Sequence, residues 1–319
     1  MSITHFRTLA IIAGAFVLTA CAGPDHRPEP AEAEMATPAP GLPEVVADDG
    51  ICPFGIPEMG PSWDDIELTF IVRDGYWLMH DDGFKTPVWV CEKMTVDHVH
   101  GPLTGRSGWC ADPELCAEPD GTAFCNPSQC DRGAVDDDYR GSGFDRGHLV
   151  PNMNERLDLD RKRETFYFSN AAPQVGARFN RTAWANFETE LTTHVCAAEH
   201  FWTITGLLYL DEDEIHRAGS LGTIGSGVEI PTHYWKLVAW LDNGELDAFV
   251  SVMPNQDYDS DASYREHIRP IAWLEAVMDI DFMPELDELL SEPLLMEPGQ
   301  PMEFTREDCR ALCGAEANC

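Results

Sequence analysis

Basic residues are scarce in this chain. Among 319 residues, 21 are Lys or Arg and 56 are Asp or Glu, which gives a formal net charge of −35 at pH 7. Because like charges slow encounter, the chain as a whole is a poor match for a polyanionic ligand. The stretch 140–181 is different, with eight basic against five acidic residues. The acidic excess elsewhere suits a soluble surface in a salty environment, where screening shortens repulsion to about 3 Å at 1 M.

Long apolar runs are equally few. Residues 9–20 are apolar over about a dozen positions, too short to span a bilayer and typical of a signal-peptide core. They lead into Leu-Thr-Ala-Cys at 18–21, which resembles a bacterial lipobox. The resemblance implies a signal peptide over 1–20, lipidation of Cys21, and a stable membrane anchor on several acyl chains. We therefore expect an exported protein of the bacterial cell envelope, an outer-membrane lipoprotein facing the periplasm or the surface. An ordinary secretory signal with a chance cysteine is the alternative.

Aromatic residues are almost absent from 21–50, which is rich in Pro, Ala, Glu and Asp. Such a segment cannot bury enough surface to offset its ordering entropy, so we predict an extended acidic tether. The rest of the chain is long enough for one large domain, and it has no internal repeat and no second apolar span. We predict one domain over 51–290, followed by a separate Cys-rich tail over 291–319.

Cysteines are plentiful, although no close CxxC pair occurs between Cys110 and Cys130. Of 11 cysteines, 10 remain when Cys21 is set aside, and an even set in an exported protein predicts disulfides. We expect five, some of them within a Cys-rich insertion at 110–132. Zinc is the alternative for that insertion. The tail contains three cysteines, Cys309, Cys313 and Cys319, so at least one should bond to the body.

The sequence GSGFDRGHLVP at 141–151 places three chemically useful side chains close together. Arg146 suits phosphate recognition, because its planar guanidinium donates paired hydrogen bonds. His148 has an ordinary pKa near neutrality, so it can act as a general base. A structural histidine beside a glycine is the alternative interpretation.

A second stretch begins with SNAAPQ at 169–174, after a predicted strand at 165–169. Asn180, Trp184 and Glu188 then follow at intervals of four, so on an α-helix running to about Cys196 they share one face. A neutral amide oxygen and a carboxylate on one face can hold a hard divalent cation, directly or through water. A capping Asn, a buried Trp and a solvated Glu are the alternative.

Together the two stretches resemble the DNA/RNA non-specific endonucleases, a family of ββα-metal (His-Me finger) nucleases that includes mitochondrial endonuclease G. Residues 138–148 match its first signature and 169–188 its second, and the resemblance covers roughly 66–290. It implies an α+β fold with a central, mostly antiparallel sheet flanked by helices. The interval from Gln174 to Asn180 is one residue longer than the usual family spacing, so we expect a reshaped entry into the helix.

The resemblance also implies a chemistry. We expect an Mg²⁺-dependent endonuclease, with Mn²⁺ as a substitute, that hydrolyses DNA and RNA to 5′-phosphate ends. His148 would be the general base, Arg146 would clamp the phosphate, Asn180 would bind the metal directly, and Glu188 would act on it through water.

Arg106 is expected to contact substrate phosphate, with a solvated loop arginine as the alternative. Asn170, Gln174 and Arg181 are expected to bind substrate or to support the residues that do. The alternatives are a catalytically silent nucleic-acid-binding lipoprotein and a structural envelope lipoprotein on the same fold. The sequence alone does not give the oligomeric state.

Overall fold

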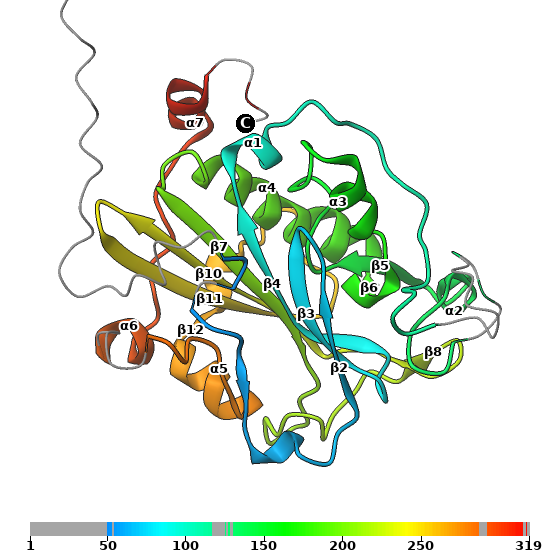
Figure 1. Cartoon of the computed structure of the whole chain (residues 1–319). Helices are drawn as coiled ribbons and strands as arrows, with labels where there is room; N and C mark the ends of the chain where they lie inside the picture. The colour runs from blue at the N-terminus through cyan, green and yellow to red at the C-terminus, as the bar shows by residue number, and fades with distance from the viewer. Residues whose placement is uncertain are drawn as a thin grey trace, which may run out of the picture. The chain divides into compact units, whose positions relative to one another are not determined.

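Four long strands with few exposed residues form the centre of the fold. They are β4 (Thr86–Met94), β7 (His200–Leu208), β10 (His233–Asp242) and β11 (Glu245–Pro254). Together with β2 (Leu68–Val72), β3 (Tyr76–Asp81) and β12 (Ile268–Arg269) they make a seven-stranded sheet in the order β12-β11-β10-β7-β4-β3-β2. Every pairing in this sheet is antiparallel, as Figure 1 shows.

The computed structural model describes residues 50–314 except 53, 117–124, 126, 128–129 and 287–291, together with residue 317. The expected signal peptide, the lipidated Cys21 and the tether up to residue 49 lie outside the described residues. Within the described part of the chain, no helix is long and apolar enough to cross a membrane.

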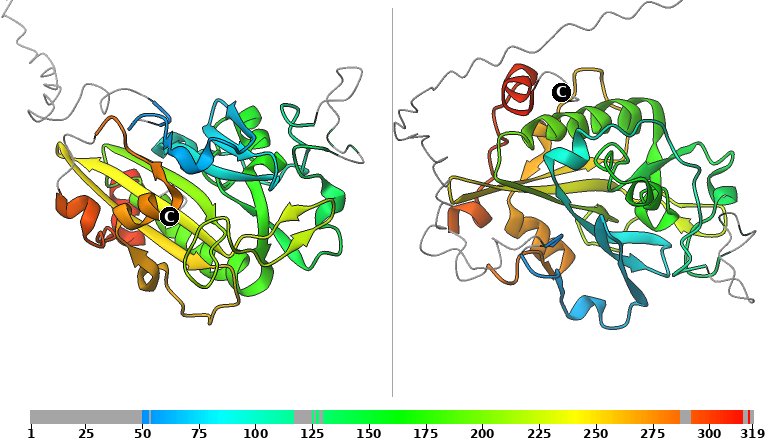
Figure 2. Two further views of the ribbon diagram at one scale, coloured as in Figure 1. Left: turned by 90° about the horizontal axis from the view of Figure 1, so that it is seen from below. Right: turned by 45° about the horizontal axis from the view of Figure 1, so that its top comes forward.

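The sheet has a layer of other elements on each face (Figures 1 and 2). One face is covered by α3 (Leu159–Glu164), the paired strands β5 (Phe144–His148) and β6 (Ala171–Val175), η4 (Gly176–Trp184) and α4 (Ala185–His194). The other is covered by α5 (Ile271–Met278), beside which α6 (Glu292–Met296) packs. The expected α+β fold with an antiparallel sheet flanked by helices is therefore confirmed.

Short elements complete the chain. They are β1 (Glu58–Met59), η2 (Pro61–Trp63), α1 (Val96–Val99), α2 (Asp136–Tyr139), η3 (Phe168–Asn170), β8 (Thr223–Ile224), β9 (Val228–Glu229), η5 (Tyr264–His267), β13 (Ile280–Asp281) and α7 (Arg306–Cys313).

Two local predictions are wrong. Residues 165–169 do not form a strand: the backbone N–H groups of Phe166 and Tyr167 close turns onto residues 163 and 164, and the 3₁₀ helix η3 follows. The helix that carries Asn180 is not α-helical from its start, because η4 is a π-helix and α4 begins only at Ala185. A π-helix bonds i to i+5, so it accommodates the additional residue between Gln174 and Asn180.

Four disulfides have both cysteines among the described residues, and they fasten the peripheral segments. Cys52–Cys91 ties the start of the described chain to β4, and Cys110–Cys125 with Cys116–Cys130 close the insertion upon itself. Cys196–Cys313 bonds the tail to the end of α4, as the odd cysteine number of the tail predicted. Cys309 is also disulfide-bonded, and Cys319 lies outside the described residues.

Candidate active site

Strand β5 presents Arg146 and His148 on one side, because residues two apart along a strand point the same way. Both lie against aromatic rings: His148 is 4.5 Å from Trp109 and 5.1 Å from Phe166 between ring centroids. The guanidinium carbon of Arg146 is 5.4 Å from the ring centroid of Tyr139. These rings fix the directions of both side chains.

His148 is arranged to stay neutral. Burial lowers its pKa to about 3, and the positive charges of Arg106 and Lys162 act in the same direction. Its Nε2 atom is buried and has no hydrogen-bond partner among the described residues. A neutral imidazole with an uncommitted nitrogen can accept a proton, which is what a general base must do.

The other side of β5 faces the core and η4. Asp145 accepts hydrogen bonds from Nδ2 of Asn180 at 2.9 Å and from Nε of Arg181 at 2.7 Å. A Cβ atom on Gly147 would lie 2.3 Å from Oε1 of Gln174, so only glycine lets the strand pack this closely. Asp145 thus holds the π-helix against the strand that carries His148.

The bond to Asp145 also orients the Asn180 side chain. Because Nδ2 is used by Asp145, the oxygen Oδ1 points elsewhere, and it has no hydrogen bond within the part of the chain that the structure describes. Asn180 is half-buried, so Oδ1 can be reached from solvent. A fixed, unshared amide oxygen is a suitable ligand for Mg²⁺.

Glu188 lies one turn into α4 and is only 9% exposed. Burial raises its pKa to about 7; the Lys236 ammonium opposes that rise and the Glu92 carboxylate adds to it. Its Oε1 atom is buried without a partner among the described atoms. A buried carboxylate with an unused oxygen fits a role beside a cation.

Two charged residues of this region were not predicted from the sequence. Lys236, on β10, is 1% exposed and donates to Oγ1 of Thr205 at 2.5 Å and to the Leu149 carbonyl at 3.2 Å. Glu92, on β4, is 1% exposed. Lys236 therefore bonds the residue after His148 and places its positive charge near the buried carboxyl groups of Glu188 and Glu92. The available signal was a charged residue in each of two otherwise buried strands.

Asn170 and Gln174 have no exposed surface. Asn170 accepts from the Val150 N–H and donates to the carbonyls of Val150 and Thr165, each at 2.9 Å, so it fastens the chain just beyond His148. Both polar atoms of the Gln174 side chain are buried without partners among the described residues. The structure does not bring either side chain to a surface that a substrate could touch.

The three candidate phosphate-binding arginines are placed differently. Arg106 is exposed, forms no ion pair with the described residues, and lies close enough to lower the pKa of His148. Arg146 pairs with Oδ1 of Asp136 at 2.6 Å, and Arg181 pairs with Asp145. Arg106 alone has its guanidinium uncommitted to a carboxylate of the described chain.

The fold and this set of side chains define a hydrolase of the ββα-metal nuclease class. The chain belongs to the DNA/RNA non-specific endonuclease family, whose sequence model matches residues 65–289. It is therefore a nuclease, its substrates are nucleic acids, and its family depends on a divalent metal ion.

Similar proteins agree with this assignment. Human mitochondrial endonuclease G is 29% identical over 218 residues, which cover 67% of this chain and 69% of the relative. Nuclease C1 of Cunninghamella echinulata var. echinulata is 25% identical over 221 residues, 68% of this chain and 84% of the relative. A crystal structure of an EndoG/EndoGI complex matches with a TM-score of 0.59 and 27% identity over 77% of this chain and 93% of that chain.

These relatives correct the expected localisation. Endonuclease G from human and the related nucleases of Schizosaccharomyces pombe and Saccharomyces cerevisiae are mitochondrial proteins of eukaryotes, which contradicts a bacterial envelope and an outer-membrane lipoprotein. That expectation was wrong, since it rested on a dozen apolar residues and Cys21, a short pattern independent of the fold. The membrane partner that it implied has no support.

Proposed function

We propose that this chain is an Mg²⁺-dependent endonuclease that cleaves DNA and RNA without sequence preference and leaves 5′-phosphate ends. One observation carries the proposal. Three polar atoms from three adjoining elements, Nε2 of His148, Oδ1 of Asn180 and Oε1 of Glu188, have no partner among the described residues. Two of these atoms, Nε2 of His148 and Oε1 of Glu188, are buried. Buried polar atoms are normally paired, and exceptions concentrate at functional sites.

His148 is the general base. Its Nε2 accepts the proton of the attacking water, and its lowered pKa keeps that nitrogen unprotonated before the reaction. Trp109 and Phe166 hold the ring, while the hydrogen bonds of Asn170 fix the chain immediately after it. Positioning the base in advance removes an entropic cost from the reaction.

The donor set fits Mg²⁺. Asn180 would hold the ion directly through Oδ1, and Glu188 would act through water, with Mn²⁺ as a substitute; one protein ligand suits an ion that keeps several waters. When bound, Mg²⁺ supplies charge stabilisation at the phosphate and at the leaving 3′ oxygen.

Substrate phosphate is held by arginine. Arg106 is available as it stands, whereas Arg146 and Arg181 each exchange a carboxylate partner for a phosphate oxygen. Such an exchange replaces one charge-assisted pair with another. Asn170 and Gln174 support the strand from inside and do not touch the substrate. The nuclease domain is proposed to span 51–290.

A plasmid digest tests the function. Purified protein is incubated with supercoiled plasmid and with structured RNA, with Mg²⁺ and with excess chelator. We expect nicking of DNA and cleavage of RNA with Mg²⁺ only, and end-labelling should find 5′-phosphates. Binding of nucleic acid without cleavage would favour the silent binding protein, and neither binding nor cleavage would favour a structural protein.

A further inference from the structure

A second cluster of metal-binding side chains lies away from the candidate active site, where the tail meets the body. His100 follows α1, Cys196 follows α4, and Cys309 and Cys313 occupy successive turns of α7. Segments more than 90 residues apart in sequence thus bring an imidazole and three sulfur atoms together.

The ligand atoms are closely spaced. Nε2 of His100 is 3.2 Å from Sγ of Cys196, and Sγ of Cys309 is 3.5 Å from the same sulfur. One ligand atom each from His100, Cys196 and Cys313 lie within 4.8 Å of one another. Zinc–sulfur and zinc–nitrogen distances of about 2.3 and 2.0 Å place the ligands of a tetrahedral site about 3.5–3.8 Å apart. The His100–Cys196 and Cys196–Cys309 separations are close to this size. The sulfur atoms of Cys196 and Cys313 are joined as a disulfide, so they must separate on reduction before both can bind one ion.

The surroundings resemble those of a built site. Burial lowers the pKa of the His100 imidazole, and hydrogen bonding with the backbone of Thr192 opposes that lowering. A metal-binding histidine usually has a partner of this kind beside the metal. Cys309 has no exposed surface and Cys196 is half-buried. Three thiolates and one imidazole form a donor set that selects zinc over hard cations.

We propose that reduction converts this cluster into a structural zinc site with His100, Cys196, Cys309 and Cys313 as ligands. In the structure Cys196 and Cys313 are bonded to each other and Cys309 is also disulfide-bonded, so the site and the disulfides are alternative states of the same sulfur atoms. The proposal is independent of the function proposed above.

The chemistry balances with a dithiol as reductant. Each dithiol molecule gives two electrons and two protons to one disulfide and leaves as a cyclic disulfide. Zn²⁺ then displaces the protons of the Cys196, Cys309 and Cys313 thiols, and His100 binds as the neutral imidazole through Nε2. Three protons are released for each zinc ion bound.

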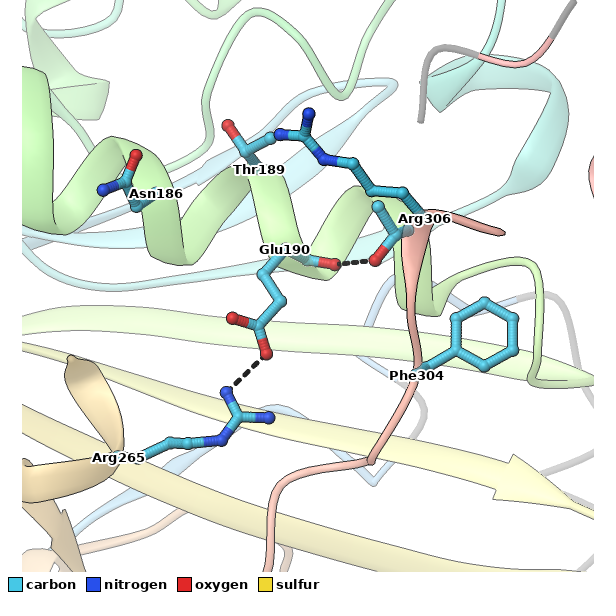
Figure 3. Close-up of a pocket in the computed structure, with 7 residues that line it drawn as sticks. Asn186, Thr189, Glu190, Arg265, Phe304 and Arg306 are labelled. Carbon is cyan, nitrogen blue, oxygen red and sulfur yellow. Dashed lines mark hydrogen bonds and ion pairs between the residues drawn. The ribbon is translucent and has the colours of Figure 1, made fainter. Parts of the chain in front are cut away.

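Either state would hold the tail against α4. Between them the tail and α4 form most of the wall of a pocket of about 410 Å³. It is lined by Phe304 and Arg306 of the tail and by Asn186, Thr189 and Glu190 of α4 (Figure 3). Arg265 completes the pocket through its ion pair with Glu190 at 2.5 Å. Zinc would therefore preserve this junction when the disulfides are reduced.

The test uses the whole chain and cobalt as the spectroscopic probe. The protein is reduced with excess dithiol under nitrogen, desalted and titrated with Co²⁺. We expect one Co²⁺ per chain with a thiolate charge-transfer band and tetrahedral d–d bands, displaced by Zn²⁺. The oxidised protein should show no such band. Because the proposed active-site ligands are oxygen atoms, a thiolate band distinguishes this cluster from them, and Asn180→Ala should leave it unchanged.

Matched variants locate the binding. Cys196→Ser with Cys313→Ser should abolish the band, whereas Cys116→Ser with Cys130→Ser removes as many thiols and should leave it intact. His100→Ala retains every disulfide, and its reduced form should bind Co²⁺ at least about tenfold more weakly, since even an outer-shell change costs that much. Undiminished binding by folded, reduced His100→Ala would overturn the proposal. A reduced wild-type chain that is folded without the band, or unfolded and not refolded by zinc, would overturn it too.

Discussion

Strand β10 sends alternate residues to the two faces of the central sheet. Toward α5 it presents Trp235 and Leu237, which belong to an apolar cluster that includes Leu274 of that helix. Toward α4 it presents Tyr234 and Lys236. These four side chains are at most 1% exposed. Both faces carry an apolar cluster, so they differ here in the buried charge of Lys236 and not in burial.

The neighbouring strands repeat this contrast. On β7, Thr203 donates to buried Glu92 on the α4 face, while Trp202 and Ile204 join the apolar cluster on the α5 face. Burying charges costs free energy that their pairing only partly returns, whereas apolar burial stabilises directly. We infer that the α5 face supplies stability, and that the α4 face gives up some of it to hold the reacting groups.

Removing the proposed metal ligand from the α4 side should cause the largest loss of activity. In Asn180→Ala the fixed amide oxygen is lost, and we expect activity to fall about as far as on loss of a general base, roughly 10²–10⁴-fold. High Mg²⁺ should restore part of it. Initial nicking rates across an Mg²⁺ titration measure this, with the exposed Asn186→Ala on the same helix layer as the control. Equal losses in both variants would point to a general disturbance of the helix.

The α5 face should respond in the opposite way. Trp235→Ala empties a fully buried site against Phe282, whose ring centroid lies 4.9 Å away, and we expect a loss of about 3–5 kcal/mol in the free energy of unfolding. Activity per folded molecule should be unchanged. Urea denaturation measures the first effect, and nicking rates per folded molecule measure the second. A loss of activity without a loss of stability would contradict the proposed difference between the faces.

Glu188→Gln retains the shape and removes the charge. We expect a loss in activity of about 10–100-fold, the range for groups that act on a metal indirectly. The pH dependence of the free energy of unfolding should also change. Because the pKa of Glu188 is raised from 4.5 to about 7 by folding, metal-free wild-type protein should lose stability as pH rises through this window, and the variant should lack that loss. Chemical denaturation at several pH values would reveal the difference.

The smallest expected effect is on the pH dependence of activity. It distinguishes titration of Glu188 from titration of His148. The pKa of His148 is lowered to about 3, so its neutral, active form persists far below the ordinary value of 6.5. If activity falls on the acid side of the profile near neutrality, protonation of Glu188 should be the cause. Bound metal should lower the pH at which this acid limb occurs, because it favours the ionised carboxylate. In Glu188→Gln this limb should vanish. If it stays in place, His148 titrates normally and its pocket is more open to water than the structure indicates.

The sequence predicted the fold class because its two signatures are specific for a family, and the resemblance to that family implies the fold. It did not predict the π-helix, because an additional residue can be accommodated in a loop or in a helix, and packing decides which. The strand expected at 165–169 failed for a related reason: its aromatic residues favour a strand, but Phe166 and Phe168 bury their rings around His148 from a turn and a 3₁₀ helix.

The site was predicted unevenly. His148 and Asn180 stand in a recognisable pattern, and the structure places each with an uncommitted polar atom. Lys236 was missed because its role depends on strand register, which determines whether a residue faces α4 or α5. Asn170 was expected to bind substrate or to support the site, and its bonds to Val150 correspond to the second of these uses. Both Asn170 and Asn180 stand in the second signature, so the sequence pattern alone does not tell a residue of the site from one that supports the fold.

Catalysis by His148, which lies in the layer that covers the α4 face, is what distinguishes the two faces in function. The most direct measurement is the rate of supercoiled-plasmid nicking by His148→Ala, with folding and metal affinity measured in the same preparation and His233→Ala as the control. We expect a loss of about 10²–10⁴-fold with fold and metal binding intact, and an unaffected control. A folded His148→Ala protein that nicks plasmid at nearly the wild-type rate would contradict it.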